Sequence, residues 1–454
     1  MTAGAQAMPA RQTGGSQRPL DEGIVPALLP PALVWTLAVL MFVLTASNGV
    51  PYRISSGFYV VLIAPLVIFA RGPAAVLRAA ETGPSRTIFY ALLMFGAANL
   101  ASTAITPNAD TMSGLLERSL LPILVYLSMI GIGLSRRDQR LFSLAVCVGG
   151  LIMFVRGALA YYAEFGIPNL STILWSRYQV DRIAGFETAT VGNVTHMGSY
   201  VALLLPMLIV ALVKLEPSRS QKALIWATLV LGLANLVVAG SRAGMIVVIG
   251  MSAILIYCVA SRRTLIRLAL AAAVIATIVT VSGLTAGNSE IVERFVPSAA
   301  GHVDGSVVER LDSMVIGWNV FLDNPLFGVG PEMSPQFNIY GIPHMSILHQ
   351  LSELGLFGGL AFTWLNIVVL NAFRKAVLQA SRGQGYFELL WLIGPTAWLT
   401  VGLFSGIVFN MSPALVWVGI SHGMLALSAA HIHADEAPRP ALSIVRVFKS
   451  LRHA

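Results

Sequence analysis

Two histidines stand five residues apart in GIPHMSILHQLSELG, residues 341–355, where a long apolar run begins. His344 follows Pro343, so we expect it at or just before the N-terminus of a helix. The partial positive charge of a helix N-terminus favours the neutral imidazole, which can accept a proton from a hydroxyl group. We therefore predict that His344 is a general base and that His349, one turn deeper, packs. An ordinary interfacial histidine is the alternative for both, and for His196 at another expected helix start.

Arginines stand at the ends of similar apolar runs. Arg242 lies in a short break within VVAGSRAGMIVV, Arg310 in the first turn of an expected loop helix, and Arg182 in SRYQVDRIAGFETATVGN. A planar guanidinium binds two phosphate oxygens at once, so converging arginines predict a pyrophosphate site. A snorkelling, topology-setting or surface arginine is the alternative at each position. Further supporting candidates are Arg156, Arg177 and Glu353.

The sequence lacks the residues that proton-coupled transport, nucleotide hydrolysis and zinc chemistry require. No Asp or Glu falls in the middle of an expected membrane span, whereas a proton-coupled transporter needs a carboxylate there. The chain has no glycine-rich phosphate loop of the Walker type and no cluster spaced for zinc. We therefore expect no metal, no cofactor and no nucleotide, and an activated substrate as the source of energy.

The composition is that of a membrane protein. Of the 454 residues, 56% are hydrophobic and 11% are charged, and the mean hydropathy is +0.76. Soluble domains are about a quarter charged. The two cysteines, Cys147 and Cys258, lie inside apolar runs, which excludes a disulfide framework. The net charge of +8 is consistent with basic cytoplasmic loops, and an acidic polymer partner is the alternative.

The apolar runs predict about twelve transmembrane helices. They lie near 28–46, 55–70, 87–105, 119–134, 141–161, 196–213, 222–239, 243–260, 268–286, 346–373, 386–406 and 410–432. With both termini cytoplasmic, every short inner loop carries three basic residues, as the positive-inside rule requires. The outer side keeps eight, which are Arg53, Arg118, Arg156, Arg177, Arg182, Arg242, Arg294 and Arg310.

Two outer loops, 162–195 and 287–345, are too long to be simple connectors, and loops of this length usually carry function. The second contains SVVERLDSMVIGWNVFLDNP, in which Ser306 and Glu309 have capping-box spacing and apolar residues recur every three to four positions. We expect an amphipathic helix there, lying in the membrane interface or on top of the helix bundle.

These features divide the chain into five parts. They are a disordered cytoplasmic tail (1–27), nine transmembrane helices (28–286), a catalytic loop (287–345), three further transmembrane helices (346–432) and a basic cytoplasmic tail (433–454). The first part lacks the apolar core of a cleavable signal peptide.

The order of AGSRAG, ERLDSMVIGWNVFLDNPLFGVGP and PHMSILHQLSELGLFGG resembles the O-antigen ligase and polymerase superfamily of bacterial inner membranes. Within it, the chain is most similar to the lipopolysaccharide O-antigen ligases, chiefly over residues 180–360. The resemblance implies an all-α polytopic fold like that of the C-type glycosyltransferases, with a periplasmic active site. Where relatives often read His-Asn, this chain reads His344-Met345, which weakens any role for a neighbouring amide.

The resemblance also implies the substrates. The donor would be a glycan on undecaprenyl pyrophosphate and the acceptor the lipid A–core, with membrane lipid but no nucleic acid or nucleotide as partner. His344 would act as the base, and Arg242 and Arg310, with Arg182, would bind the pyrophosphate. Direct displacement would invert the anomeric centre without a metal. An O-antigen polymerase or a protein O-glycosylation ligase of the same superfamily is the near alternative, and a transporter of lipid-linked sugar the distant one.

Overall fold

The structure is a computed structural model. It describes residues 72–81, 85–120, 136–165, 194–214, 217–239, 242–259, 305–340, 342–381 and 386–405, with a few positions between 65 and 69 and between 122 and 127. Within these ranges every regular element is a helix and there is no strand. The prediction of an all-α protein is therefore confirmed over the described part of the chain.

The helices begin and end as follows. They are α3 (Pro73–Ala80), α4 (Ser85–Ile105), α5 (Ala109–Leu115), the π-helical turn η1 (Leu116–Leu120), α7 (Arg136–Phe165), α11 (Val194–Lys214), α12 (Arg219–Ala239), α13 (Arg242–Val259), α16 (Gly305–Asp323), α17 (Ser334–Phe337), α18 (Ser346–Ser381) and α19 (Tyr386–Ser405).

Seven expected apolar spans coincide with these helices. Helices α4, α7, α11, α12, α13, α18 and α19 match the expected spans that begin at residues 87, 141, 196, 222, 243, 346 and 386. The expected loop helix is α16, which begins at Gly305 and ends before Asn324-Pro325. The two terminal tails and the expected spans 28–46, 268–286 and 410–432 lie outside the described residues, as do most of 55–70 and 119–134.

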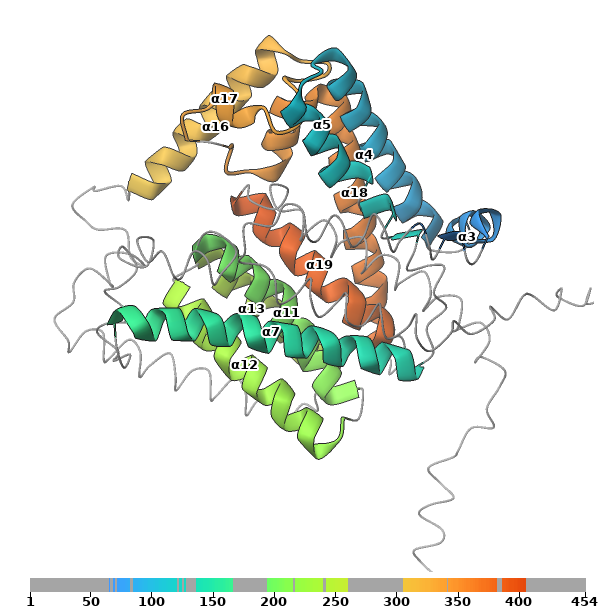
Figure 1. The fold of residues 1–454 in the computed structure, drawn as a ribbon, viewed down its shortest axis with the longest axis vertical. Coiled ribbons are helices and arrows are strands. Elements are labelled where there is room, and N and C mark those ends of the chain that lie inside the picture. The colour runs from blue at the N-terminus through green and yellow to red at the C-terminus, as the bar shows by residue number, and fades with distance from the viewer. Residues whose placement is uncertain are drawn as a thin grey trace, which may run out of the picture.

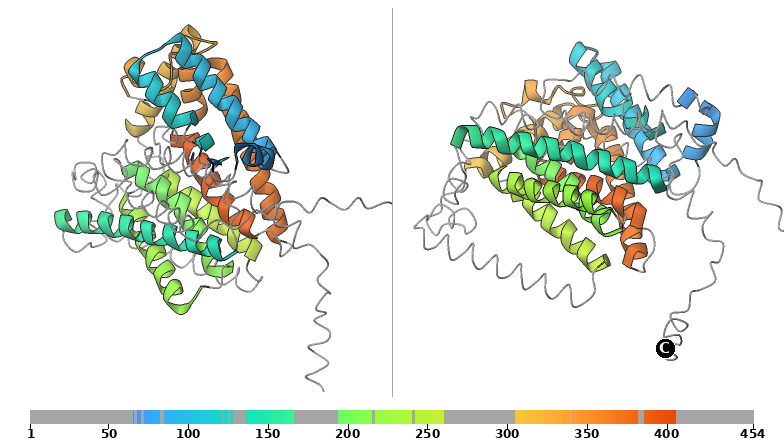
Figure 2. Two further views of the ribbon diagram at one scale, coloured as in Figure 1. Left: turned by 45° about the vertical axis from the view of Figure 1, so that its right-hand side comes forward. Right: turned by 60° about the horizontal axis from the view of Figure 1, so that its bottom comes forward.

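The helices form two groups (Figure 1). The upper group contains α4, α5, η1, α16, α17 and the first turns of α18, and the lower group contains α7, α11, α12, α13 and α19. Helix α18 joins the two, because it packs against α4 and α16 and then against α19 and α13. The left view of Figure 2 shows the same separation from another side.

The two groups have different interiors. In the lower group, α11 contacts α7, α12, α13 and α19, and its middle is fully apolar and buried, as Leu203, Leu204 and Leu205 show. In the upper group, α4 runs antiparallel to α18, with the Phe95 ring against Phe362 and the Ser102 hydroxyl bonded to the Glu353 carbonyl. Buried polar side chains therefore concentrate where α4 meets the start of α18.

Among the described residues, two helices are long and apolar enough to cross a membrane, over Arg86–Ile105 in α4 and over Ser346–Ser381 in α18. Shorter apolar stretches occur at Leu144–Leu159, Ala243–Leu255 and Leu392–Leu403. Large apolar side chains also face outward, among them Ile246 (70% exposed), Ile249 (68%) and Leu360 (61%). Such a surface agrees with a helical membrane protein, and the number of twelve spans stays a prediction.

Candidate active site

The motif PLFGVGP lies against a break in α18. At Gly355 the backbone leaves the helical region, with φ 65° and ψ −161°. Loop residues take over the hydrogen bonds that the break leaves open. These bonds are Val329 N–H to Ser352 O (3.1 Å), Gly330 N–H to Glu353 O (2.9 Å) and Leu356 N–H to Pro325 O (2.8 Å). The loop 325–333 and the start of α18 thus form one hydrogen-bonded unit.

Two glycines make this close packing possible. Gly328 and Gly355 both have positive φ, at 68° and 65°. A Cβ on Gly328 would overlap the backbone of Glu353, and a Cβ on Gly355 would overlap the backbone of Leu326. Only glycine fits both the conformation and the space, which accounts for the glycines of PLFGVGP and of the ELG that follows the two histidines.

A buried ionic cluster lies beside this unit. The guanidinium of Arg118, on η1, is 1% exposed and donates through Nη1 to Oε2 of Glu353, which is fully buried. Its Nε and Nη2 donate to Oε1 of Glu332 at 2.9 Å and 2.6 Å. Burial alone would lower the pKa of Arg118, but the two carboxylates raise it above its ordinary value, so the guanidinium stays charged.

Glu353 has further partners on its other oxygen. The backbone N–H of Ser334, the first residue of α17, donates to Oε1 at 3.1 Å. His349 Nε2 lies 3.0 Å from the same oxygen. The hydroxyls of Ser334 and Ser352 lie 3.1 Å apart. One carboxylate therefore joins η1, α17 and α18.

His344 lies directly before this cluster in the chain. It is half-buried and two residues ahead of Ser346, where α18 begins, so the predicted position before a helix N-terminus is confirmed. Pro343 packs against Gly317 of α16, and Ser313 of α16 donates from its hydroxyl to the carbonyl of Ile342 at 2.8 Å. Helix α16 therefore supports the segment that carries His344.

The other predicted site residues divide between the two groups. Arg310 is half-buried on α16, and Glu353 is buried on α18, so both share the upper group with His344. Arg242 is the first residue of α13, and Arg156 is half-buried on α7, both in the lower group. The predicted site residues Arg177 and Arg182 fall outside the described residues.

Sequence reasoning did not assign a role to Arg118 or Glu332. Arg118 belonged to the eight outer arginines, and its place between two apolar runs was the available signal, because an arginine at membrane depth needs a counter-charge. Its partners follow it by 214 and 235 positions, so no local pattern identifies them. His349 is fully buried, as packing requires, but it also contacts Glu353.

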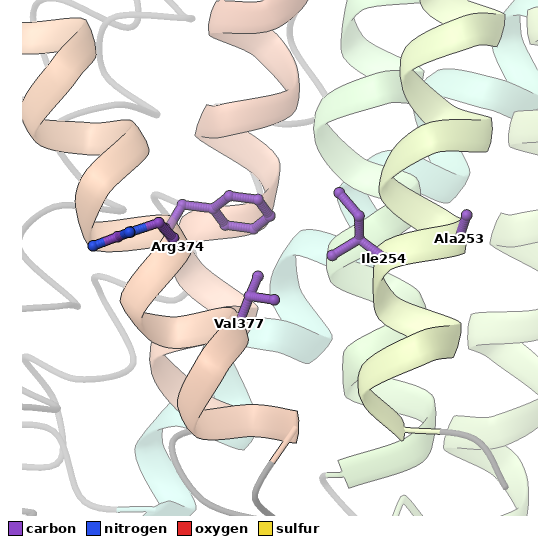
Figure 3. A pocket seen from close by; sticks show the side chains of 5 residues that line it. Ala253, Ile254, Arg374 and Val377 are labelled. Carbon is purple, nitrogen blue, oxygen red and sulfur yellow. The ribbon is translucent and has the colours of Figure 1, made fainter.

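A hollow between α13 and α18 lies away from this cluster (Figure 3). It is lined by Ala253, Ile254, Phe373, Arg374 and Val377, toward the far end of α18 from His344. Of the described residues that line it, only Arg374 is charged, so they include no acid–base pair. Among the residues that the structure describes, no three His, Cys, Asp or Glu side chains gather as metal ligands would.

Comparison with known proteins gives one family match. Residues 227–363 match the model of a family described as O-antigen ligase. The matched segment runs from α12 into α18 and contains Arg242, Arg310, His344 and Glu353, but not Arg118. No curated protein matches the chain. The resemblance found in the sequence motifs is confirmed at the level of the superfamily.

Proposed function

We propose that this chain, which carries the domain of the O-antigen ligase superfamily over residues 227–363, transfers a glycan from undecaprenyl pyrophosphate to the lipid A–core of lipopolysaccharide. The reaction takes place at the periplasmic face of the bacterial inner membrane. The protein crosses that membrane about twelve times, with both termini in the cytoplasm. The family match supports glycosyl transfer in general, and the proposal adds the donor, the acceptor and the orientation.

The observation that carries the proposal is the position of His344. It lies half-buried inside the matched segment, directly before α18 and next to the Pro343–Gly317 contact with α16. The hydroxyl oxygen of the acceptor attacks the anomeric carbon of the donor and gives its proton to His344. The bond from that carbon to the pyrophosphate oxygen breaks in the same step, which inverts the anomeric centre. General-base assistance of this kind contributes roughly 10²–10⁴-fold.

Arginines bind the leaving group in this mechanism. Arg310, Arg242 and Arg182 hold the pyrophosphate through paired hydrogen bonds and neutralise the charge that develops on it. This is the electrostatic role that a divalent cation plays in many other transferases. The reaction therefore requires neither a metal nor a nucleotide.

The outward face of α16 supports a site at the membrane surface. Its apolar residues are exposed by 43% to 59%, and they are Val308, Leu311, Val315, Trp318 and Leu322. The opposite face, with Ser313 and Gly317, packs against the segment before α18. An amphipathic helix with this arrangement lies in the interface plane of a bilayer. Both proposed substrates are lipids with their reacting sugars at that level.

The alternatives differ chiefly in the acceptor. A polymerase would use a second lipid-linked glycan, and a protein O-glycosylation ligase a serine or threonine, with the same roles for His344 and the arginines. A transporter would need a charged cavity near the middle of its spans. The described ionic cluster instead joins η1 and the loop before α17 to the first turns of α18, which favours a transferase.

Transfer in a purified system tests the proposal. The protein in detergent is mixed with undecaprenyl-pyrophosphate glycan and lipid A–core, with EDTA and no nucleotide, and a gel separates capped from uncapped lipid. We expect product from the wild type and roughly a hundredfold less from His344→Ala. Met345→Ala, at the neighbouring half-buried position, is the matched control and retains activity.

Each other outcome changes the proposal in a defined way. Longer chains on the lipid carrier, with no capped lipid, would identify a polymerase. Full activity in folded His344→Ala would remove the general-base role. If EDTA abolished the transfer activity and an added divalent cation restored it, that result would contradict the role given to the arginines.

A further inference from the structure

The ionic cluster joins two parts of the chain that the family match separates. Glu332 and Glu353 lie inside residues 227–363, whereas Arg118 lies outside them, on η1. Glu353 is fully buried, and a buried carboxylate without a counter-charge is strongly unfavourable. The matched domain therefore depends on a cation that the N-terminal part of the chain supplies.

The local backbone at Arg118 is unusual. Arg118 lies in the middle of a five-residue π-helical turn, Leu116–Leu120, that directly follows α5. Short π-helical segments inside α-helices occur frequently at functional sites. Gly114 of α5 packs against Pro331, close enough that a Cβ there would lie 2.7 Å from the proline ring. The turn that presents Arg118 is thus seated on the loop that carries Glu332.

Glu353 closes the segment that carries His344. Its Oε1 accepts the N–H of Ser334 at 3.1 Å, so it links the first residue of α17 to α18. The Ser334 and Ser352 hydroxyls, 3.1 Å apart, make a second link at the same place. His344 lies near the middle of the segment 334–353, whose two ends these contacts hold together.

We propose that Arg118 and Glu353 are positioning residues of the transfer site: their ion pair closes the segment 334–353 and so holds His344 in place. This inference rests on the proposed function. Glu353 also reaches α4 through its carbonyl, which accepts the Ser102 hydroxyl at 3.0 Å, so the closed segment is attached to the first described membrane-length helix. Neither residue needs to touch a substrate.

The first test separates rate from substrate binding. Arg118→Met and Glu353→Gln remove one charge each, and we expect kcat to fall by roughly tenfold to a hundredfold, because small displacements of a catalytic group have effects of that size. The KM for the lipid-linked donor stays within about twofold, since Arg310 is left in place. Arg118→Lys keeps the charge but cannot bridge both carboxylates, so its kcat should lie between that of the wild type and that of Arg118→Met. Glu332→Gln is the matched control, because Glu332 is 26% exposed and water replaces its lost charge interaction.

The second test separates positioning from simple stability. In Arg118→Met/Glu353→Met no buried charge is left unpaired, so the double variant regains the unfolding temperature that the single variants lose. Its kcat stays at least about tenfold low, because the Ser334 N–H and His349 have no carboxylate to contact. Recovery of kcat in the double variant would show that the pair only stabilises the fold. Wild-type kcat in Arg118→Met would overturn the proposal directly.

Hydrogen exchange tests the closure of the segment 334–353 independently of the proposed reaction. In the full-length protein without substrate, Arg118→Met should raise amide exchange across 334–353 and leave the lower group unchanged. Unchanged exchange in that segment would overturn the positioning role. If the wild type transfers no glycan to any acceptor but the segment opens in the variant, the proposed function is wrong and the closure of the segment is still supported.

Discussion

The upper and lower helix groups are held together by different forces. In the upper group, polar contacts join segments that are far apart in sequence, such as Arg118 with Glu353 and Ser313 with Ile342. In the lower group, the described buried side chains are mostly apolar, with polar bonds between helices such as that from Asn235 to the Phe154 carbonyl at 3.0 Å. Directional contacts fix a geometry, whereas apolar packing tolerates small shifts. The proposed base His344, with Arg310, lies in the group whose contacts are directional.

The largest expected difference between the two groups concerns the substitution of one glycine in each. Gly355→Ala places a Cβ at φ 65° and against the backbone of Leu326, so we expect a loss of more than about 4 kcal/mol of unfolding free energy, with transfer activity abolished. Gly250→Ala on α13 meets nothing within 4 Å and should be neutral or stabilise by up to about 1 kcal/mol. Thermal unfolding of both variants in detergent measures the difference. Equal stability of the two would contradict the tight fit of the loop against α18.

The second prediction concerns the lower group alone. Phe154 is fully buried in α7, and Phe154→Ala should cost about 3–4 kcal/mol of unfolding free energy through the cavity that it leaves. Because Phe154 contributes no group to the proposed site and His344 lies in the upper group, activity per folded molecule should stay near that of the wild type. Unfolding curves give the stability, and kcat normalised to folded protein gives the activity. A large fall in normalised kcat would mean that the lower group also sets the geometry of the site.

The smallest expected effect comes from the outward face of α16. Trp318 is 48% exposed and packs beside Phe321, with ring centroids 5.3 Å apart. Trp318→Ser should weaken the contact with the membrane interface and raise the KM for both lipid substrates by about threefold to tenfold, with kcat unchanged. Asn319→Ser, at an exposed neighbour, is the control. An unchanged KM in vesicles would contradict the interfacial position of α16.

Much of the architecture could be predicted from the sequence because apolar length and helical periodicity are local properties. Seven expected spans match helices of the structure, although α18 continues to Ser381, past the expected end at 373. The expected loop helix matches α16, which ends at Asp323 before Asn324-Pro325. The position of His344 before a helix followed from Pro343 and the apolar run after it. The superfamily followed from short motifs within the matched segment.

The ionic cluster could not be predicted in the same way. Whether Arg118 is a surface residue or a buried counter-charge depends on which carboxylate the fold brings to it, and Glu353 lies 235 positions away. The roles of Gly328 and Gly355 also depend on distant contacts. A Cβ on Gly328 would overlap the backbone of Glu353, and a Cβ on Gly355 would overlap the backbone of Leu326. The sequence by itself predicted the seven long apolar helices and α16, and it indicated residues that could perform glycosyl transfer, whereas α3, α5, η1 and α17 were not predicted. Only the tertiary structure decided which charges are buried together, because burial and pairing depend on contacts between distant segments.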